Sequence, residues 1–164
     1  MTIATSLRFY DIAVFIHIAA VVIAFGVVFV YPLIVPFTLR QAPDKVGWVH
    51  RLQGVIGQRI ITLGGALVLI SGLYLALSGD GPFDFGDWWT GFGLVAILLL
   101  LGLGGAYFNP RERRLAELAE RDGGTPSPEY RTLLREWTLV ARASMTLVLV
   151  TVLIMVLGAR LVFT

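Results

Sequence analysis

The chain has 164 residues, of which 57% are hydrophobic and only 15% are charged. Soluble domains are about 45–50% apolar and about 25% charged, so this chain has too little charge to cover a soluble surface. Its hydrophobicity excludes disorder, and a formal net charge of +2 gives no support for nucleic-acid binding. The absence of cysteine excludes disulfides, thiolate metal sites and thiol catalysis. The composition therefore indicates a membrane protein.

Four apolar runs, uncharged apart from His17, predict four membrane-spanning helices. The runs are Ile12–Leu39, Ile60–Gly79, Trp88–Phe108 and Ala143–Ala159. About 20 apolar residues cross the bilayer core as a helix, so we expect spans at about 9–34, 58–79, 88–108 and 138–161. The whole chain, residues 1–164, is then one transmembrane domain in a lipid bilayer.

Charge is segregated among the three connections. The connection between the second and third runs has only acidic charges, at Asp80, Asp84 and Asp87. The other two connections hold ten of the thirteen basic residues: Arg40, Lys45, Arg51, Arg59, Arg111, Arg113, Arg114, Arg121, Arg131 and Arg135. Basic loops stay on the cytoplasmic side, so we expect both basic connections to be cytoplasmic and both termini to lie outside.

The last connection has a helical pattern of its own. Residues 111–121 read RERRLAELAER and are followed by Gly123-Gly124, which is typical of a helix end. Ser127-Pro128-Glu129 is typical of a helix start. We predict an all-α, antiparallel up-down four-helix transmembrane bundle with a long helical cytoplasmic hairpin between helices 3 and 4. This hairpin is either a solvated surface or a docking surface for a partner or for anionic lipid.

Stripes of small residues at helical spacing predict which faces of the spans pack together. Small residues let helix backbones approach closely where lipid supplies no hydrophobic driving force. Four antiparallel spans can close around their own seam, so we favour a self-contained bundle. A homodimer or a membrane protein partner stays open as an alternative.

His17 is the one titratable group deep in a span other than tyrosine. Such a group is costly unless it faces the bundle interior. One interpretation is a neutral histidine that hydrogen-bonds across helices to Tyr74 or Thr151. The other is a haem ligand, a metal ligand or a proton-relay group, with Met155 as the candidate sixth ligand of a haem b. His50 lies on the cytoplasmic side, which disfavours a bis-histidine haem, and no separate metal site is predicted.

A second polar group gathers at the inner ends of the spans. It comprises His50, Arg51, Gln58, Arg59, Asn109 and Arg142. We favour the interpretation that the arginines extend to the membrane interface. The alternative is a cytoplasmic vestibule for an anionic ligand. No phosphate loop, serine-hydrolase or metalloprotease motif is present, so catalytic residues are not identified and enzymatic activity stays open.

Several segments together resemble one family. They are FIHIAAVVIAFGVVFVYPLI, GPFDFGDWWTGFG, PRERRLAELAERDGG and EYRTLLREW. The pattern resembles the bacterial membrane family called domain-of-unknown-function family 2269 over nearly the whole chain. That family resembles, more distantly, CopD-type copper-resistance domains and HemJ-type four-helix haem proteins. The resemblance implies a bacterial inner membrane location and a haem-ligand role for His17 alone.

Three hypotheses for function follow. The first is a small membrane bundle that binds a ligand or a partner and lacks a recognisable catalytic site. The second is a haem-b-binding redox protein with His17 as axial ligand. The third, with least support, is a permease for small solutes or metal ions.

Overall fold

The structure is a computed structural model that describes residues 8–81 and 83–162, and every secondary-structure element in these ranges is a helix. Residues 1–7, 82, 163 and 164 of the predicted domain lie outside the described part. The elements are α1 (Phe9–Gly26), η1 (Val27–Val30), α2 (Tyr31–Gln41), η2 (Pro43–Lys45), α3 (Val46–Ile56), η3 (Gly57–Ile61), α4 (Thr62–Leu77), α5 (Trp88–Gly102), η4 (Leu103–Phe108), α6 (Asn109–Arg121) and α7 (Pro128–Val162).

These elements join into four long rods that are apolar enough to cross a membrane. The rods are Phe9–Gln41, Pro43–Leu77, Trp88–Arg121 and Pro128–Ala159, with 33, 35, 34 and 32 residues. The prediction of four apolar helices is confirmed. At ~1.5 Å per residue each rod is about 50 Å long, whereas a bilayer core is about 30 Å thick. Each rod is therefore about 20 Å longer than the core it has to cross.

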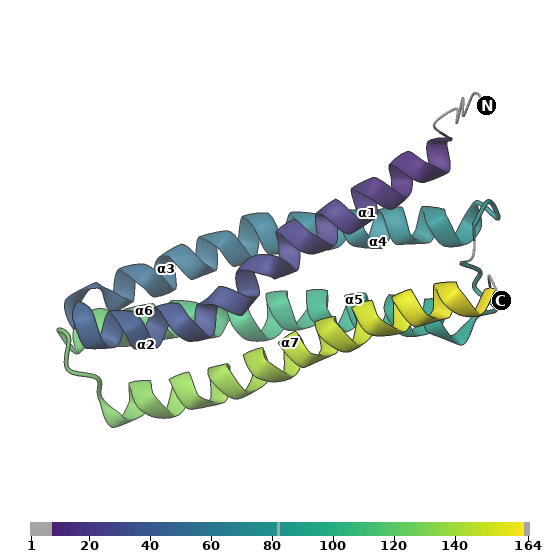
Figure 1. Cartoon of the computed structure of the whole chain (residues 1–164). Coiled ribbons are helices and arrows are strands. Elements are labelled where there is room, and N and C mark those ends of the chain that lie inside the picture. The colour runs from purple at the N-terminus through teal and green to yellow at the C-terminus, as the bar shows by residue number, and fades with distance from the viewer. Residues whose placement is uncertain (1–7, 82, 163–164) are drawn as a thin grey trace.

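The connections at the two ends of the molecule in Figure 1 differ in charge by sequence. The α2–α3 turn and the α6–α7 turn lie at one end, which we call the basic end because the basic connections are there. The connection between α4 and α5 lies at the opposite end, which we call the acidic end after Asp80, Asp84 and Asp87.

The first rod bends in its middle (Figure 1). Pro32 and Pro36 lack the backbone N–H that an α-helix needs, and their rings clash with the preceding turn. The tighter 3₁₀ turn η1 lies just before Pro32, where the α-helical hydrogen bonding is interrupted. The bend lets α1 follow α4 while α2 lies along α3.

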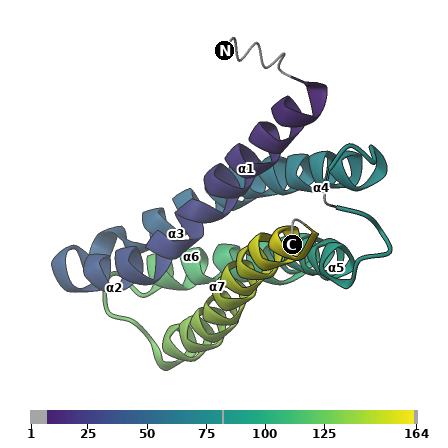
Figure 2. The same cartoon turned by 45° about the vertical axis from the view of Figure 1, so that its right-hand side comes forward.

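The connection between the first two spans is more helical than we expected. We predicted a projecting helical structure only between the third and fourth spans. Instead α3 begins at Val46, directly after the short 3₁₀ turn η2, and continues without a break into η3 and α4. The excess length of the rods therefore forms two helical hairpins, α2–α3 and α6–α7, which pack against each other (Figure 2).

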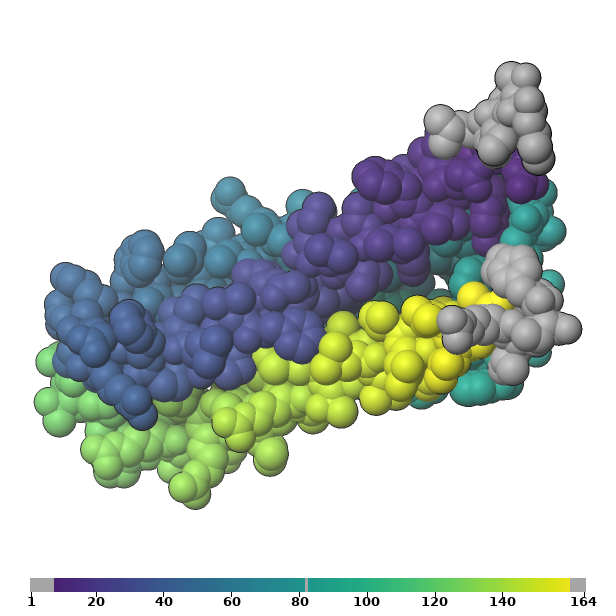
Figure 3. Space-filling model, in the orientation of Figure 1, coloured from purple at the N-terminus to yellow at the C-terminus, as the bar shows by residue number. Residues whose placement is uncertain are grey.

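Two buried clusters hold the rods together. The middle cluster, which is small and aliphatic apart from one phenylalanine, consists of Ala20, Ala24, Phe25, Val68, Ile97 and Val148. The basic-end cluster is larger and more aromatic and consists of Tyr31, Val35, Val46, Val49, Leu115, Leu118, Ala119, Tyr130, Trp137 and Ala141. Toward the acidic end, α1 and the last part of α7 separate from each other (Figure 3).

Large apolar side chains cover the outside of the rods. Phe15, Leu33 and Leu139 are 71%, 70% and 70% exposed. So much exposed apolar surface would be unfavourable in water, but it is the surface that lipid requires.

We expect Gly64→Ala to weaken the contact between α1 and α4. A Cβ atom on Gly64 would lie 2.6 Å from the Cβ of Ala24, which is too close for two carbon atoms. Overpacking of this kind costs about 1–3 kcal/mol, so the temperature of unfolding in detergent should fall. The matched control is Gly26→Ala, where a Cβ would meet no atom within 4 Å. Equal unfolding temperatures for the two variants would contradict the described packing.

Candidate functional site: a buried polar cluster

Polar side chains that are almost fully buried gather at the basic end. His50, Gln53 and Glu112 are 0%, 2% and 4% exposed. They lie where α3 and α6 pack at close range, since a Cβ on Gly47 would meet the Cγ of Glu120 at 2.8 Å. We call His50, Gln53, Glu112, Asn109 and Tyr130 the polar cluster.

His50 is anchored to α7. Its Nε2 atom lies 2.8 Å from the hydroxyl oxygen of Tyr130, and the two rings meet edge to face with centroids 5.8 Å apart. The other ring nitrogen, Nδ1, has no hydrogen-bond partner in the described part of the chain. Tyr130 therefore fixes the ring through one nitrogen, and the side chain of Gln53 lies beside the ring.

Gln53 lies one helical turn after His50 on α3. Its backbone carbonyl accepts a hydrogen bond of 3.5 Å from the hydroxyl of Tyr31. The side-chain amide is buried, and neither its oxygen nor its nitrogen has a partner among the described residues. Buried amides are nearly always paired with protein or with ordered water, so this one marks a place for water or a ligand.

Glu112 is a buried carboxyl without a positive partner. No Lys or Arg nitrogen within the described ranges lies within 4 Å of it, and its Oε2 atom has no hydrogen-bond partner there. That oxygen faces the glycine surface of α3, because Cβ atoms on Gly54 and Gly57 would lie 3.5 and 3.8 Å from it. The amide oxygen of Asn109 faces the same point, 3.7 Å from a Cβ on Gly57. Two acceptor oxygens from α6 thus converge over one glycine of η3.

Two π-helical segments lie beside the polar cluster. They are η3 and η4, and they contact each other. A π-helical turn is rare, loosens the regular backbone ladder and occurs frequently at functional sites. In η3 the carbonyl of Gly57 accepts a hydrogen bond of 3.1 Å from the Thr62 hydroxyl. The irregular backbone of both rods therefore meets at the level where Asn109 and Glu112 face α3.

The polar cluster has the chemistry of a binding site. It offers acceptor oxygens, an amide and an imidazole nitrogen in a region closed to bulk solvent, where each unpaired group carries a cost. No three His, Cys, Asp or Glu side chains of the described residues gather in a way that could hold a metal ion.

The arginines of the predicted inner vestibule point elsewhere. Arg51 is exposed and forms a two-pronged ion pair with Glu120, with both N–O distances at 2.6 Å. Gln58 and Arg59 are exposed on η3. Of the six predicted vestibule residues, only His50 and Asn109 belong to the polar cluster.

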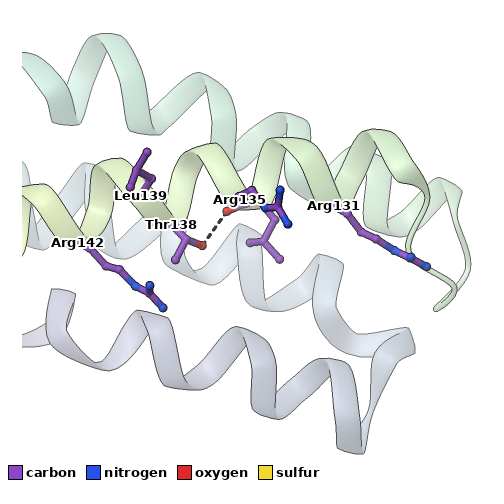
Figure 4. A pocket seen from close by; sticks show the side chains of 6 residues that line it. Arg131, Arg135, Thr138, Leu139 and Arg142 are labelled. Carbon is purple, nitrogen blue, oxygen red and sulfur yellow. Dashed lines mark hydrogen bonds between the residues drawn. The ribbon is translucent and has the colours of Figure 1, made fainter.

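Arg142 lies on α7, in a shallow hollow of about 360 Å³ (Figure 4). The hollow is lined by Arg131, Leu134, Arg135, Thr138, Leu139 and Arg142. All six residues come from one face of a single helix, and the Thr138 hydroxyl donates to the carbonyl of Leu134 at 2.7 Å. The hollow is an open strip of positive charge and has no opposing wall.

His17 faces α4, and its partner there is one we did not predict. Its Nδ1 atom lies 3.0 Å from the Ser71 hydroxyl oxygen. Ser71 uses its own proton toward the carbonyl of Leu67 at 2.6 Å, so His17 is the donor. A Cβ on Gly72 would lie 3.1 Å from the Cε1 atom of His17, which shows how closely the ring packs on α4.

The predicted partners of His17 have other contacts. The Tyr74 ring packs edge to face against Phe9, with centroids 5.6 Å apart. The Thr151 hydroxyl donates to the carbonyl of Leu147 at 2.7 Å. Met155 packs against α5, where its Cε atom occupies the space of a Cβ on Gly93. His17 thus packs against α4, and Met155 packs against α5.

Sequence reasoning missed Gln53, Glu112 and Tyr130. Glu112 stands in the strongly charged segment 111–121, and we did not single it out there. The residue spacing could have indicated that Glu112 is buried, because Glu112, Leu115 and Ala119 lie on one helical face. Leu115 and Ala119 on that face are 0% and 8% exposed. Gln53 follows His50 by three residues, so both side chains lie on one face of α3.

The fold and the site define a multi-span helical membrane protein with a polar cluster outside its uncharged runs. The model of one family, described as predicted integral membrane protein (DUF2269), matches residues 11–158, and the chain belongs to this family. No curated protein and no solved structure matches the chain.

We expect Tyr130→Phe to destabilise the basic end. The change leaves the shape of the ring but removes the partner of His50 Nε2, and an unpaired buried polar group costs about 1–3 kcal/mol. The control is Tyr74→Phe, because Tyr74 is 36% exposed and its ring contact with Phe9 is retained. Thermal unfolding in detergent measures both. An unchanged midpoint for Tyr130→Phe would show that this hydrogen bond contributes nothing.

Proposed function

We propose that the protein is a ligand-binding bundle of a bacterial inner membrane. The rods cross the membrane in up-down order, the basic end with its two hairpins lies in the cytoplasm, and both termini lie outside. The segregation of charge between the two ends supports this orientation.

The polar cluster is the proposed binding site. One observation carries the proposal: the buried side chains of His50, Gln53 and Glu112 all have polar atoms without a partner among the described residues, and they lie together at the basic end. A purely structural core would replace such groups with apolar ones of similar volume at little cost. A ligand that enters from the cytoplasm would supply the missing partners.

The alternatives have less support from the geometry. The two residues proposed for a shared haem face different helices, His17 toward Ser71 on α4 and Met155 toward Gly93 on α5. No observation joins them in a shared haem site, and we derive no redox step from them. For a permease, the middle cluster gives no support, because its members are apolar side chains. The two buried clusters join the four rods within one chain, so we propose a bundle that is complete without a second copy or partner.

Single-cysteine labelling tests the site and the orientation together, because the chain has no cysteine of its own. In Gly57→Cys the new side chain faces Asn109 and Glu112 at ordinary contact distance. We expect this cysteine to react with a small charged methanethiosulfonate reagent in inside-out vesicles and to stay unreactive in right-side-out spheroplasts.

Two further variants are the controls. Ala24→Cys places the thiol in the middle cluster, at a position that is 0% exposed, and should not react from either side. Ser78→Cys lies at the acidic end and should react only in spheroplasts. A Gly57→Cys protein that is inert in both preparations would overturn the proposed ligand site, and reversed sidedness would overturn the orientation.

A further inference from the structure

The unpaired carboxyl of Glu112 suggests which kind of ligand the polar cluster takes. We propose that the occupant is a small cation bound at Glu112, with the amide oxygens of Gln53 and Asn109 as further acceptors. This inference rests on the proposed binding site and specifies that its ligand is positively charged.

The balance of charge around Glu112 is the first argument. The titratable groups that the neighbouring elements contribute to the basic-end core and the polar cluster are Tyr31 from α2, His50 from α3 and Tyr130 from α7. On α6 itself, the guanidinium of Arg111 stacks on the ring of Tyr107 at 3.7 Å. Within the described residues, no arginine or lysine side chain pairs with Glu112. A buried carboxylate without a compensating charge is strongly unfavourable, so a cation has to neutralise it.

The kinds of atom around the carboxyl are the second argument. Glu112 Oε2 and Asn109 Oδ1 converge over Gly57, and the unpartnered Oε1 of Gln53 comes from the same face of α3. Hard oxygen atoms of this kind bind alkali ions or share a proton. An anion would face the carboxylate of Glu112 and is disfavoured.

The available space limits the size of the cation. Glu112 Oε2 lies 3.5 and 3.8 Å from where Cβ atoms on Gly54 and Gly57 would stand, which is ordinary van der Waals distance. A small cation therefore suits this close interface of α3, η3 and α6 better than a bulky one. Asn109 is only half-buried and marks the side from which the ion would enter.

The experiment measures thermal unfolding of the full chain in detergent along two series. In the first series, sodium replaces choline at constant ionic strength and pH. In the second, pH rises in choline buffer without alkali ion. If an alkali ion is the occupant, the unfolding midpoint rises with the logarithm of the sodium concentration once that concentration exceeds the dissociation constant. If a proton is the occupant, the folded state holds one proton more than the unfolded state, so the midpoint falls as pH rises above the ordinary range of a glutamate.

The variant Glu112→Gln keeps the shape and removes the charge, and it should abolish whichever response the wild type shows. Glu136→Gln is the matched control, since Glu136 is exposed on α7, and it should keep the response. If Glu112→Gln does not fold, Glu112→Asp retains the charge on a shorter side chain and should bind the cation with at least tenfold lower affinity.

A wild type that responds to neither series, or a Glu112→Gln protein with the full response, would overturn the cation proposal. The proposed ligand site would survive that result if Gly57→Cys is labelled from the inner side, because the occupant would then be a neutral polar molecule. The two failures are therefore distinguishable.

Discussion

The mismatch between helix length and bilayer thickness is the constraint on which the rest of the structure depends. Each rod is about 50 Å long, and the hydrocarbon core it crosses is about 30 Å thick. Within lipid, the backbone of each rod satisfies its own hydrogen bonds, so the helix continues as long as its side chains allow. All four rods reach the basic end, and there the molecule builds a second core.

The two cores are built from different kinds of side chain. In the middle cluster the helices meet through alanine, valine and glycine, and the contact of Gly64 with Ala24 brings α1 and α4 together at close range. Close backbone approach matters in lipid because no hydrophobic effect drives association there. The basic-end cluster instead buries large side chains such as Trp137 and Leu115, which are 2% and 0% exposed. The polar cluster lies beside this more aromatic core.

The sequence was sufficient for the four apolar helices because hydropathy and length determine them almost alone. It was also sufficient to single out His50 and Asn109, although we grouped them with arginines that the structure turns outward. Glu112 could not be separated from its charged neighbours by composition, since its burial depends on the glycine face of α3, which lies more than fifty residues away in the chain. The Ser71 partner of His17 was missed for a related reason, because serine on a helix is usually paired with its own backbone and Ser71 has both kinds of partner.

The positions of the two π-helical segments connect the membrane to the polar cluster. Each segment lies between an apolar stretch and a charged one: η3 precedes the uncharged Thr62–Leu77, and η4 precedes α6 with its arginines. A π-helical turn inserts extra backbone, which rotates the helix that follows relative to the one before. In the third rod Glu112 follows η4 and faces α3, and in the second rod Gly54 and Gly57 leave the space that the carboxyl occupies. Both irregular segments thus lie where the rods pass between the apolar runs and the polar cluster, so the change of backbone geometry and the change of chemistry coincide along each rod.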